Sequence, residues 1–110
     1  MTKQTTTTPA DLLTEVGRAL YGGDWANPMA RALGITENSL RKLLRGKLRL
    51  TPDHGVMQAA LQLLDEERVR QDGNLERLRQ DAASDRRLSE VAVRRDTAAK
   101  LATRLKLMIG

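Results

Sequence analysis

Aliphatic residues three and four positions apart recur through most of this chain and restrict it to helical folds. Its 110 residues include no Phe, one Trp and one Tyr, so leucine and alanine have to build the core. Apart from the four threonines at 5–8, runs of β-branched residues, which favour strands, are absent. We therefore predict an all-α fold, with room for one small domain and an extension.

Proline and glycine divide the first half into short helices. Thr8 followed by Pro9 is typical of an N-cap and first helical residue, and this first helix should end at the glycine pair 22–23. Asn27 and Pro28 repeat the pattern and predict the start of a second helix. Residues 1–8 are polar and threonine-rich, so we expect a disordered arm there.

The next signals predict a third and a fourth helix. Gly34 marks a turn, Thr36 is placed to cap the third helix, and Gly46 closes it. Thr51 and Pro52 then predict the start of a fourth helix. The two predicted turns leave residues 36–45 as one short helix.

Helix-forming residues continue to the C-terminus, interrupted at Gly73-Asn74 and Ser84-Asp85. Two series with 3-4 spacing run through this region and predict a helical hairpin or a short coiled coil. They are Leu61, Leu64, Arg68, Gln71, Leu75, Leu78 and Ala82, then Leu88, Val91, Arg95, Ala98, Ala102, Leu105 and Ile109. We predict a domain at residues 9–70 and a helical extension at 71–110 that mediates oligomerisation.

Residues 26–45 have the spacing of a DNA-binding helix-turn-helix. Such a unit needs a small residue where its helices meet, a glycine in the turn, and aliphatic residues that hold the second helix to the body. These positions are occupied by Ala30, Gly34, Ile35, Leu40 and Leu43.

The opposite side of the third helix carries side chains that can read base edges. Asn38, Arg41, Lys42 and Arg45 lie at i, i+3, i+4 and i+7, on one polar stripe. Arginine and lysine donate to guanine, and asparagine pairs with adenine. An ordinary solvated helix face would have a similar pattern. The stripe therefore indicates DNA binding only in combination with the helix-turn-helix spacing.

The stretch from about Leu12 to Leu64 resembles the Xre or lambda-repressor-like (Cro-type) helix-turn-helix family. The resemblance also rests on Trp25 before the second helix, on Leu43-Leu44-Arg45-Gly46, and on Thr51-Pro52. It implies a transcriptional regulator, commonly a repressor, that binds double-stranded DNA operators as a homodimer. The implied base-reading residues are Thr36, Glu37, Asn38, Arg41 and Lys42. The implied backbone contacts are Asn27, Ser39, Arg45, Lys47 and Arg49.

The net charge of +5 and the pI near 10.2 favour a polyanionic partner. Residues 1–55 carry +3, residues 56–84 carry −2 and residues 85–110 carry +4. The basic C-terminal segment either dimerises, which we prefer, or contacts DNA as a second surface; a membrane helix is disfavoured because aromatic anchors are missing.

No enzymatic activity, metal or cofactor is expected. The chain has no cysteine and one histidine, His54, for which we predict a surface position, and its acidic run 65–67 spreads around a helix. Trp25 is expected to anchor the core. Without a secretory leader or an apolar segment of spanning length, we expect a cytoplasmic protein, nucleoid-associated when bound to DNA.

Two other functions fit the same residues. A helix-turn-helix fold could serve as a protein-interaction adaptor, with residues 71–110 as the docking surface. Alternatively, an architectural protein could coat DNA with little sequence preference, which would require both basic ends on one surface.

Overall fold

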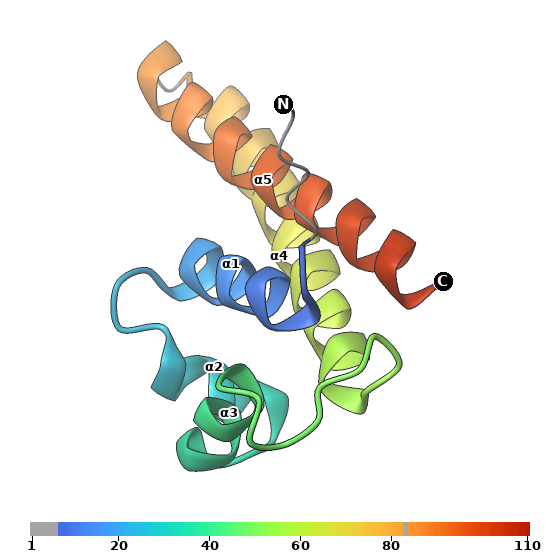
Figure 1. Cartoon of the computed structure of the whole chain (residues 1–110). Coiled ribbons are helices and arrows are strands. Elements are labelled where there is room, and N and C mark those ends of the chain that lie inside the picture. Colours follow the sequence, from blue (N-terminus) through green and yellow to red (C-terminus); the bar gives the residue numbers. More distant parts are fainter. Residues whose placement is uncertain (1–6, 83) are drawn as a thin grey trace, which may run out of the picture.

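The computed structural model describes residues 7–82 and 84–110 and confirms an all-α fold (Figure 1). The described part of the chain contains five helices: α1 Pro9–Tyr21, α2 Ala26–Leu33, α3 Glu37–Leu44, α4 Gly55–Gln80 and α5 Asp85–Ile109. Residues 1–6 of the predicted arm lie outside the described residues, whereas Thr8 of that arm caps α1.

The start of α1 forms as the sequence predicts. The Thr8 hydroxyl accepts a hydrogen bond from the Asp11 N–H at 3.1 Å, and the Asp11 carboxylate accepts one from the Thr8 N–H at 3.3 Å. This reciprocal capping box satisfies two backbone groups that would otherwise lack partners, and Pro9 supplies the first helical residue. The helix ends at Tyr21, and Gly22 is its C-cap.

The beginning of α2 differs from the prediction. Trp25 precedes the first helical residue and makes no side-chain capping hydrogen bond, so Asn27 is not the cap. Asn27 and Pro28 instead lie in the first turn, where proline is tolerated because the first amides have no partner within the helix.

A three-residue turn, 34–36, joins α2 to α3. Gly34 adopts the left-handed conformation with φ 76°, and the Ile35 N–H donates to the Ala30 carbonyl at 3.0 Å. Gly46 repeats this arrangement after α3, with φ 80° and a hydrogen bond from the Lys47 N–H to the Lys42 carbonyl at 2.9 Å. Both helices therefore end in the glycine motif that the sequence indicated.

The fourth helix begins three residues later than the Thr51-Pro52 signal predicts. His54 is the N-cap of α4, and its Nδ1 accepts a hydrogen bond from the Val56 N–H at 3.2 Å. The Thr51 hydroxyl bonds the Asp53 carboxylate and not the start of a helix. His54 is accordingly half-buried at a helix end, whereas the sequence predicts a surface position.

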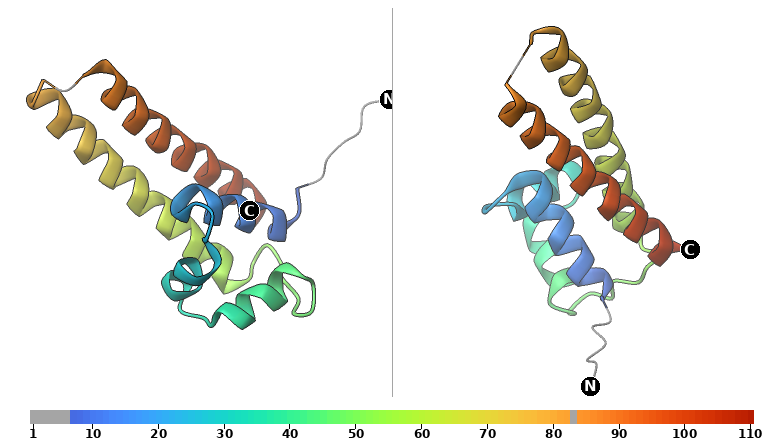
Figure 2. Two further views of the ribbon diagram at one scale, coloured as in Figure 1. Left: turned by 90° about the vertical axis from the view of Figure 1, so that its left-hand side faces the viewer. Right: turned by 90° about the horizontal axis from the view of Figure 1, so that it is seen from above.

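Helices α4 and α5 lie side by side and antiparallel as a hairpin (Figures 1 and 2). The Gly73-Asn74 signal does not interrupt α4, whereas Ser84 caps α5 by accepting from the Arg87 N–H. The predicted seam of α4 is wrong at two positions. Arg68 is exposed while Glu67 is buried, and Ala82 lies beyond the end of α4 and is exposed. The next buried residue after Leu64 is therefore three positions further along the helix, and not four as predicted.

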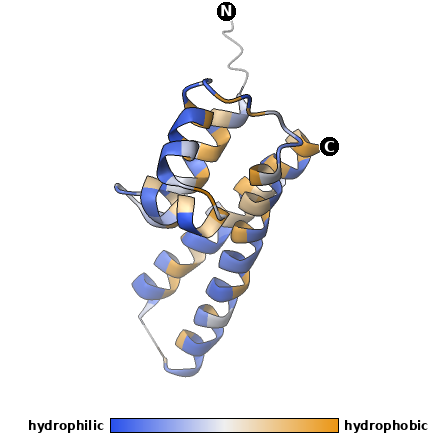
Figure 3. Ribbon diagram, turned by 90° about the horizontal axis from the view of Figure 1, so that it is seen from below, coloured by the Kyte–Doolittle hydropathy of each residue, from blue (hydrophilic) through white to orange (hydrophobic). Residues whose placement is uncertain are grey.

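One hydrophobic core joins α1 to both arms of the hairpin. It contains Leu12, Leu13 and Val16 of α1 together with buried residues from α2, α3 and α4. The C-terminal half of α5 adds Ala98, Leu101, Ala102 and Leu105. In Figure 3 the distal part of the hairpin is mostly hydrophilic. The boundary predicted between residues 70 and 71 falls inside α4, and the apolar stripe of α5 packs within the chain.

Trp25 packs against α1, as predicted. Gly17 makes this possible, because a Cβ atom there would overlap the indole ring and would lie 2.8 Å from the Met29 sulfur. The half-buried indole therefore uses the missing side chain of Gly17 to hold the start of α2 against α1.

Gly17→Ala should lower the free energy of unfolding by about 1–3 kcal/mol, because the added methyl group collides with Trp25. Gly73→Ala is the matched control, since Gly73 also lies inside a helix but a Cβ atom added there would meet no neighbour within 4 Å. It should raise the stability by about 0.5–1 kcal/mol. Urea denaturation measures both, and a stabilising Gly17→Ala would contradict the packing described.

Candidate nucleic-acid interface

Helix α3 has one face in the core and the other at the surface. Leu40 and Leu43 are buried, with 0% and 4% of their surface exposed. The predicted outward residues are all exposed: Asn38, Arg41, Lys42 and Arg45. Contacts with α1 and α2 hold α3 in this orientation. The structure thus brings together the polar stripe that the sequence predicted.

The start of α3 is fixed by two hydroxyl groups. The Thr36 hydroxyl accepts a hydrogen bond from the Ser39 N–H at 3.0 Å and donates its proton to the Ser39 hydroxyl oxygen at 2.9 Å. Thr36 is exposed and Ser39 is half-buried. Because its hydroxyl oxygen accepts from the Ser39 N–H, Thr36 acts in this structure as a helix cap.

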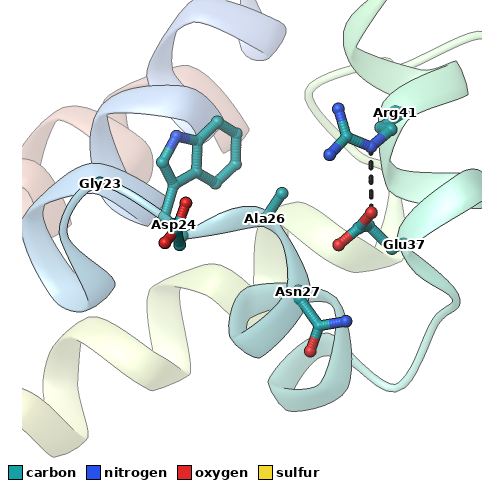
Figure 4. A pocket seen from close by; sticks show the side chains of 7 residues that line it. Gly23, Asp24, Ala26, Asn27, Glu37 and Arg41 are labelled. Carbon is teal, nitrogen blue, oxygen red and sulfur yellow. Dashed lines mark hydrogen bonds and ion pairs between the residues drawn. The ribbon is translucent and has the colours of Figure 1, made fainter.

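Glu37 and Arg41 form an ion pair one turn apart on α3. The Arg41 Nε donates to the Glu37 Oε2 at 3.2 Å, and the side chains of Arg41 and Glu37 are 49% and 36% exposed, respectively. Figure 4 shows the pair on one side of a hollow, with Asp24 on the other. The pair orients Arg41 without linking α3 to another helix.

The hollow has a volume of about 450 Å³ and separates the loop before α2 from the start of α3. Its lining residues are Gly23, Asp24, Trp25, Ala26, Asn27, Glu37 and Arg41. Asn27, the predicted backbone-contacting residue of α2, is exposed on this hollow. Residues from both short helices therefore share one concave surface.

The segment after α3 presents the remaining predicted cations. Arg45, Lys47 and Arg49 are exposed, and together with residues 8–10 of α1 and its cap they line a second hollow of about 610 Å³. Thr51 donates a hydrogen bond that lowers the pKa of the Asp53 carboxyl, and a hydrogen bond from the Asp53 backbone N–H and the nearby Arg49 guanidinium lower it further. The segment therefore combines several cations with one carboxylate that stays ionised near neutral pH.

Several cations of α5 are engaged in ion pairs. Arg104 contacts the Glu15 carboxylate of α1 at 2.7 Å, and Arg95 contacts Asp72 of α4 at 3.4 Å and Asp96 at 2.8 Å. The hydrogen bonds to these carboxylates raise the pKa of both guanidinium groups. These arginines therefore connect α5 to α1 and α4.

No protein family, curated protein or solved structure matches this chain. The resemblance to the lambda-repressor-like family therefore stays a prediction from the residues quoted above. Within residues 7–82 and 84–110, every helix is too short or too polar to cross a membrane.

Glu37 is predicted from the sequence to face DNA, and its ion pair was not part of that prediction. Glutamate four residues before arginine on a helix is a favourable i,i+4 pair, so the spacing of Glu37 and Arg41 was the available signal. The hydrogen bond between Thr36 and Ser39 depends on hydroxyl geometry that spacing alone does not give.

Thr36→Ala should lower the free energy of unfolding by about 1 kcal/mol, because the Ser39 N–H loses its capping acceptor. Thr36→Ser keeps the acceptor oxygen and should stay close to the wild type. Thermal unfolding followed by circular dichroism compares the three proteins, and hydrogen exchange of the Ser39 amide reports the cap directly. Equal exchange in all three would contradict the capping role.

Proposed function

We propose that this protein is a sequence-specific, double-stranded DNA-binding transcriptional regulator that acts as a repressor by occupying its operator. The proposal rests on the two sides of α3. Leu40 and Leu43 are buried on one side. The polar residues on the other side and at the C-cap are exposed, namely Asn38, Arg41, Lys42 and Arg45. These are the side-chain types that distinguish base pairs in the major groove.

The dimensions of α3 support the same function. An α-helix is about 10–12 Å across with its side chains, so α3 fits the major groove, which is about 12 Å wide. Recognition helices of this kind contact bases mainly through their N-terminal residues, which here include Glu37 and Asn38. Arg41 and Lys42 lie in the last turn of α3, on the same exposed side as Asn38. We therefore assign Asn38, Arg41 and Lys42 to base contacts.

Cations after α3 and an asparagine near its start provide candidate phosphate contacts. Arg45, Lys47 and Arg49 follow the helix, and Asn27 lies across the hollow at its start. Each phosphate neutralised should reduce the logarithm of the affinity by about 0.9 per logarithmic unit of salt. These contacts would position α3 without reading sequence.

We also propose that the protein binds its operator as a homodimer. A dimer requires a surface other than the apolar stripe of α5, because Ala98, Leu101, Ala102 and Leu105 are buried within the chain. The arrangement of the operator tests this point, since a two-fold dimer binds an inverted repeat.

A protein-interaction adaptor is the second candidate. The distal part of the α4–α5 hairpin extends away from α1, α2 and α3 (Figures 1 and 2), and this would give a protein partner a separate surface. The architectural alternative has less support, because Arg95 and Arg104 are already paired with carboxylates.

Selection from a random duplex library at about 150 mM salt, with the full chain, tests the proposal. We expect enrichment of an inverted repeat. Enrichment of a single half-site would contradict the dimer but keep the sequence-specific function. DNA retained without enrichment would favour the architectural function, and no retained DNA would favour the adaptor.

Asn38→Ala and Lys47→Ala should have different effects on binding. Asn38→Ala should cost about 1–3 kcal/mol on the selected sequence and relax the preference at one base pair. Lys47→Ala should weaken all sequences alike and reduce the salt slope by about one. Fluorescence anisotropy with selected and scrambled duplexes measures both. Equal losses on the two duplexes for Asn38→Ala would remove it from the base-reading set.

A further inference from the structure

We propose that Glu37 is a positioning residue that directs Arg41 toward a guanine, and that it does not read a base itself. This inference rests on the proposed function, because it assigns roles within the same α3 surface. It also changes the role expected for Glu37 from the sequence, which was direct base contact.

The geometry of the ion pair limits how Arg41 can bind a base. Its Nε–H donates to the Glu37 Oε2 at 3.2 Å, so the carboxylate occupies one edge of the guanidinium group. The two terminal nitrogens remain as the donors for an external acceptor. Guanine presents two acceptors on its major-groove edge, N7 and O6, and arginine contacts both at once. Arg41 is therefore oriented for end-on recognition of guanine.

A contribution to folding stability does not account well for the ion pair between Glu37 and Arg41. Both side chains are substantially exposed, and exposed pairs of this spacing contribute little to folding. Arginine has many rotamers, and ordering such a side chain is a cost of binding. Because Glu37 holds Arg41 on the same helix before DNA arrives, part of that cost is met in the free protein.

Direct base reading by Glu37 is less compatible with the same geometry. A carboxylate could accept a hydrogen bond from the cytosine amino group, but one Glu37 oxygen already accepts from Arg41. An isolated carboxylate near DNA would also be repelled by the phosphates. Arg41 offsets that charge, so the pair as a unit can approach the groove.

The test compares base preferences of wild-type protein with those of Glu37→Ala, Glu37→Gln, Arg41→Ala and the double variant, by selection from a random duplex library. Wild-type protein should prefer guanine about tenfold or more at one base pair, and Arg41→Ala should lose that preference. Glu37→Ala should reduce it about two- to tenfold at the same base pair. The double variant should match Arg41→Ala.

Two further comparisons separate positioning from a structural role. Removing the negative charge of Glu37 should raise affinity for scrambled DNA while guanine preference falls, whereas damage to the fold would lower both. Glu37→Gln keeps an acceptor oxygen for the Arg41 Nε–H and should retain part of the preference. Glu90→Ala removes a comparable exposed pair with Arg86, at 3.5 Å on α5, and should change no base preference.

An unchanged guanine preference in Glu37→Ala overturns the inference. A preference lost at a different base pair, for cytosine, also overturns it and assigns Glu37 to direct reading. If wild-type protein enriches no sequence, the proposed function itself fails, and this inference fails with it.

Discussion

The burial of the apolar stripe of α1 is the interaction on which the rest of the structure depends. Leu13 and Val16 are fully buried and Leu12 is almost so, and α1 packs against each of the other four helices. Helix α3 takes its orientation from α1 and α2. The direction in which its exposed side chains point is therefore set by the core, although none of those side chains belongs to it.

The α4–α5 hairpin completes this core, and α4 adds buried polar side chains next to it. A domain of about 60 residues buries a smaller fraction of its surface than a larger one, so the aliphatic residues that α5 adds are a substantial contribution. Beyond them, Gln71 donates to the buried Glu67 carboxylate at 3.3 Å, and Asn74 donates to Gln71 at 3.1 Å. This chain of hydrogen bonds satisfies polar groups that would be costly to bury alone.

Local signals in the sequence predicted much of the fold and of the candidate site. Thr8, Gly34, Thr36 and Gly46 occupy the predicted caps and turns, because each acts through contacts within a few residues. The exposed stripe of α3 followed equally from helical spacing. The helix starts predicted from Asn27-Pro28 and Thr51-Pro52 were wrong. Proline is tolerated within a first turn and in a loop, so its presence does not define where a helix begins. The docking of α5 was not predictable in the same way, since an apolar stripe packs equally well within a chain or between chains.

The arginines of this protein illustrate why net charge alone is a weak guide to a binding surface. Arg104 and Arg95 are paired across helices, and their charges contribute to the attachment of α5. Arg41 is paired within α3, so its ion pair orients the side chain while leaving the helix surface exposed. The C-terminal segment carries more net positive charge than the first half, yet the exposed cations that share a surface with base-reading side-chain types lie on and after α3. A candidate DNA surface therefore has to be judged by where each charged side chain lies and which groups it pairs with. By that criterion α3 is a stronger candidate than α5.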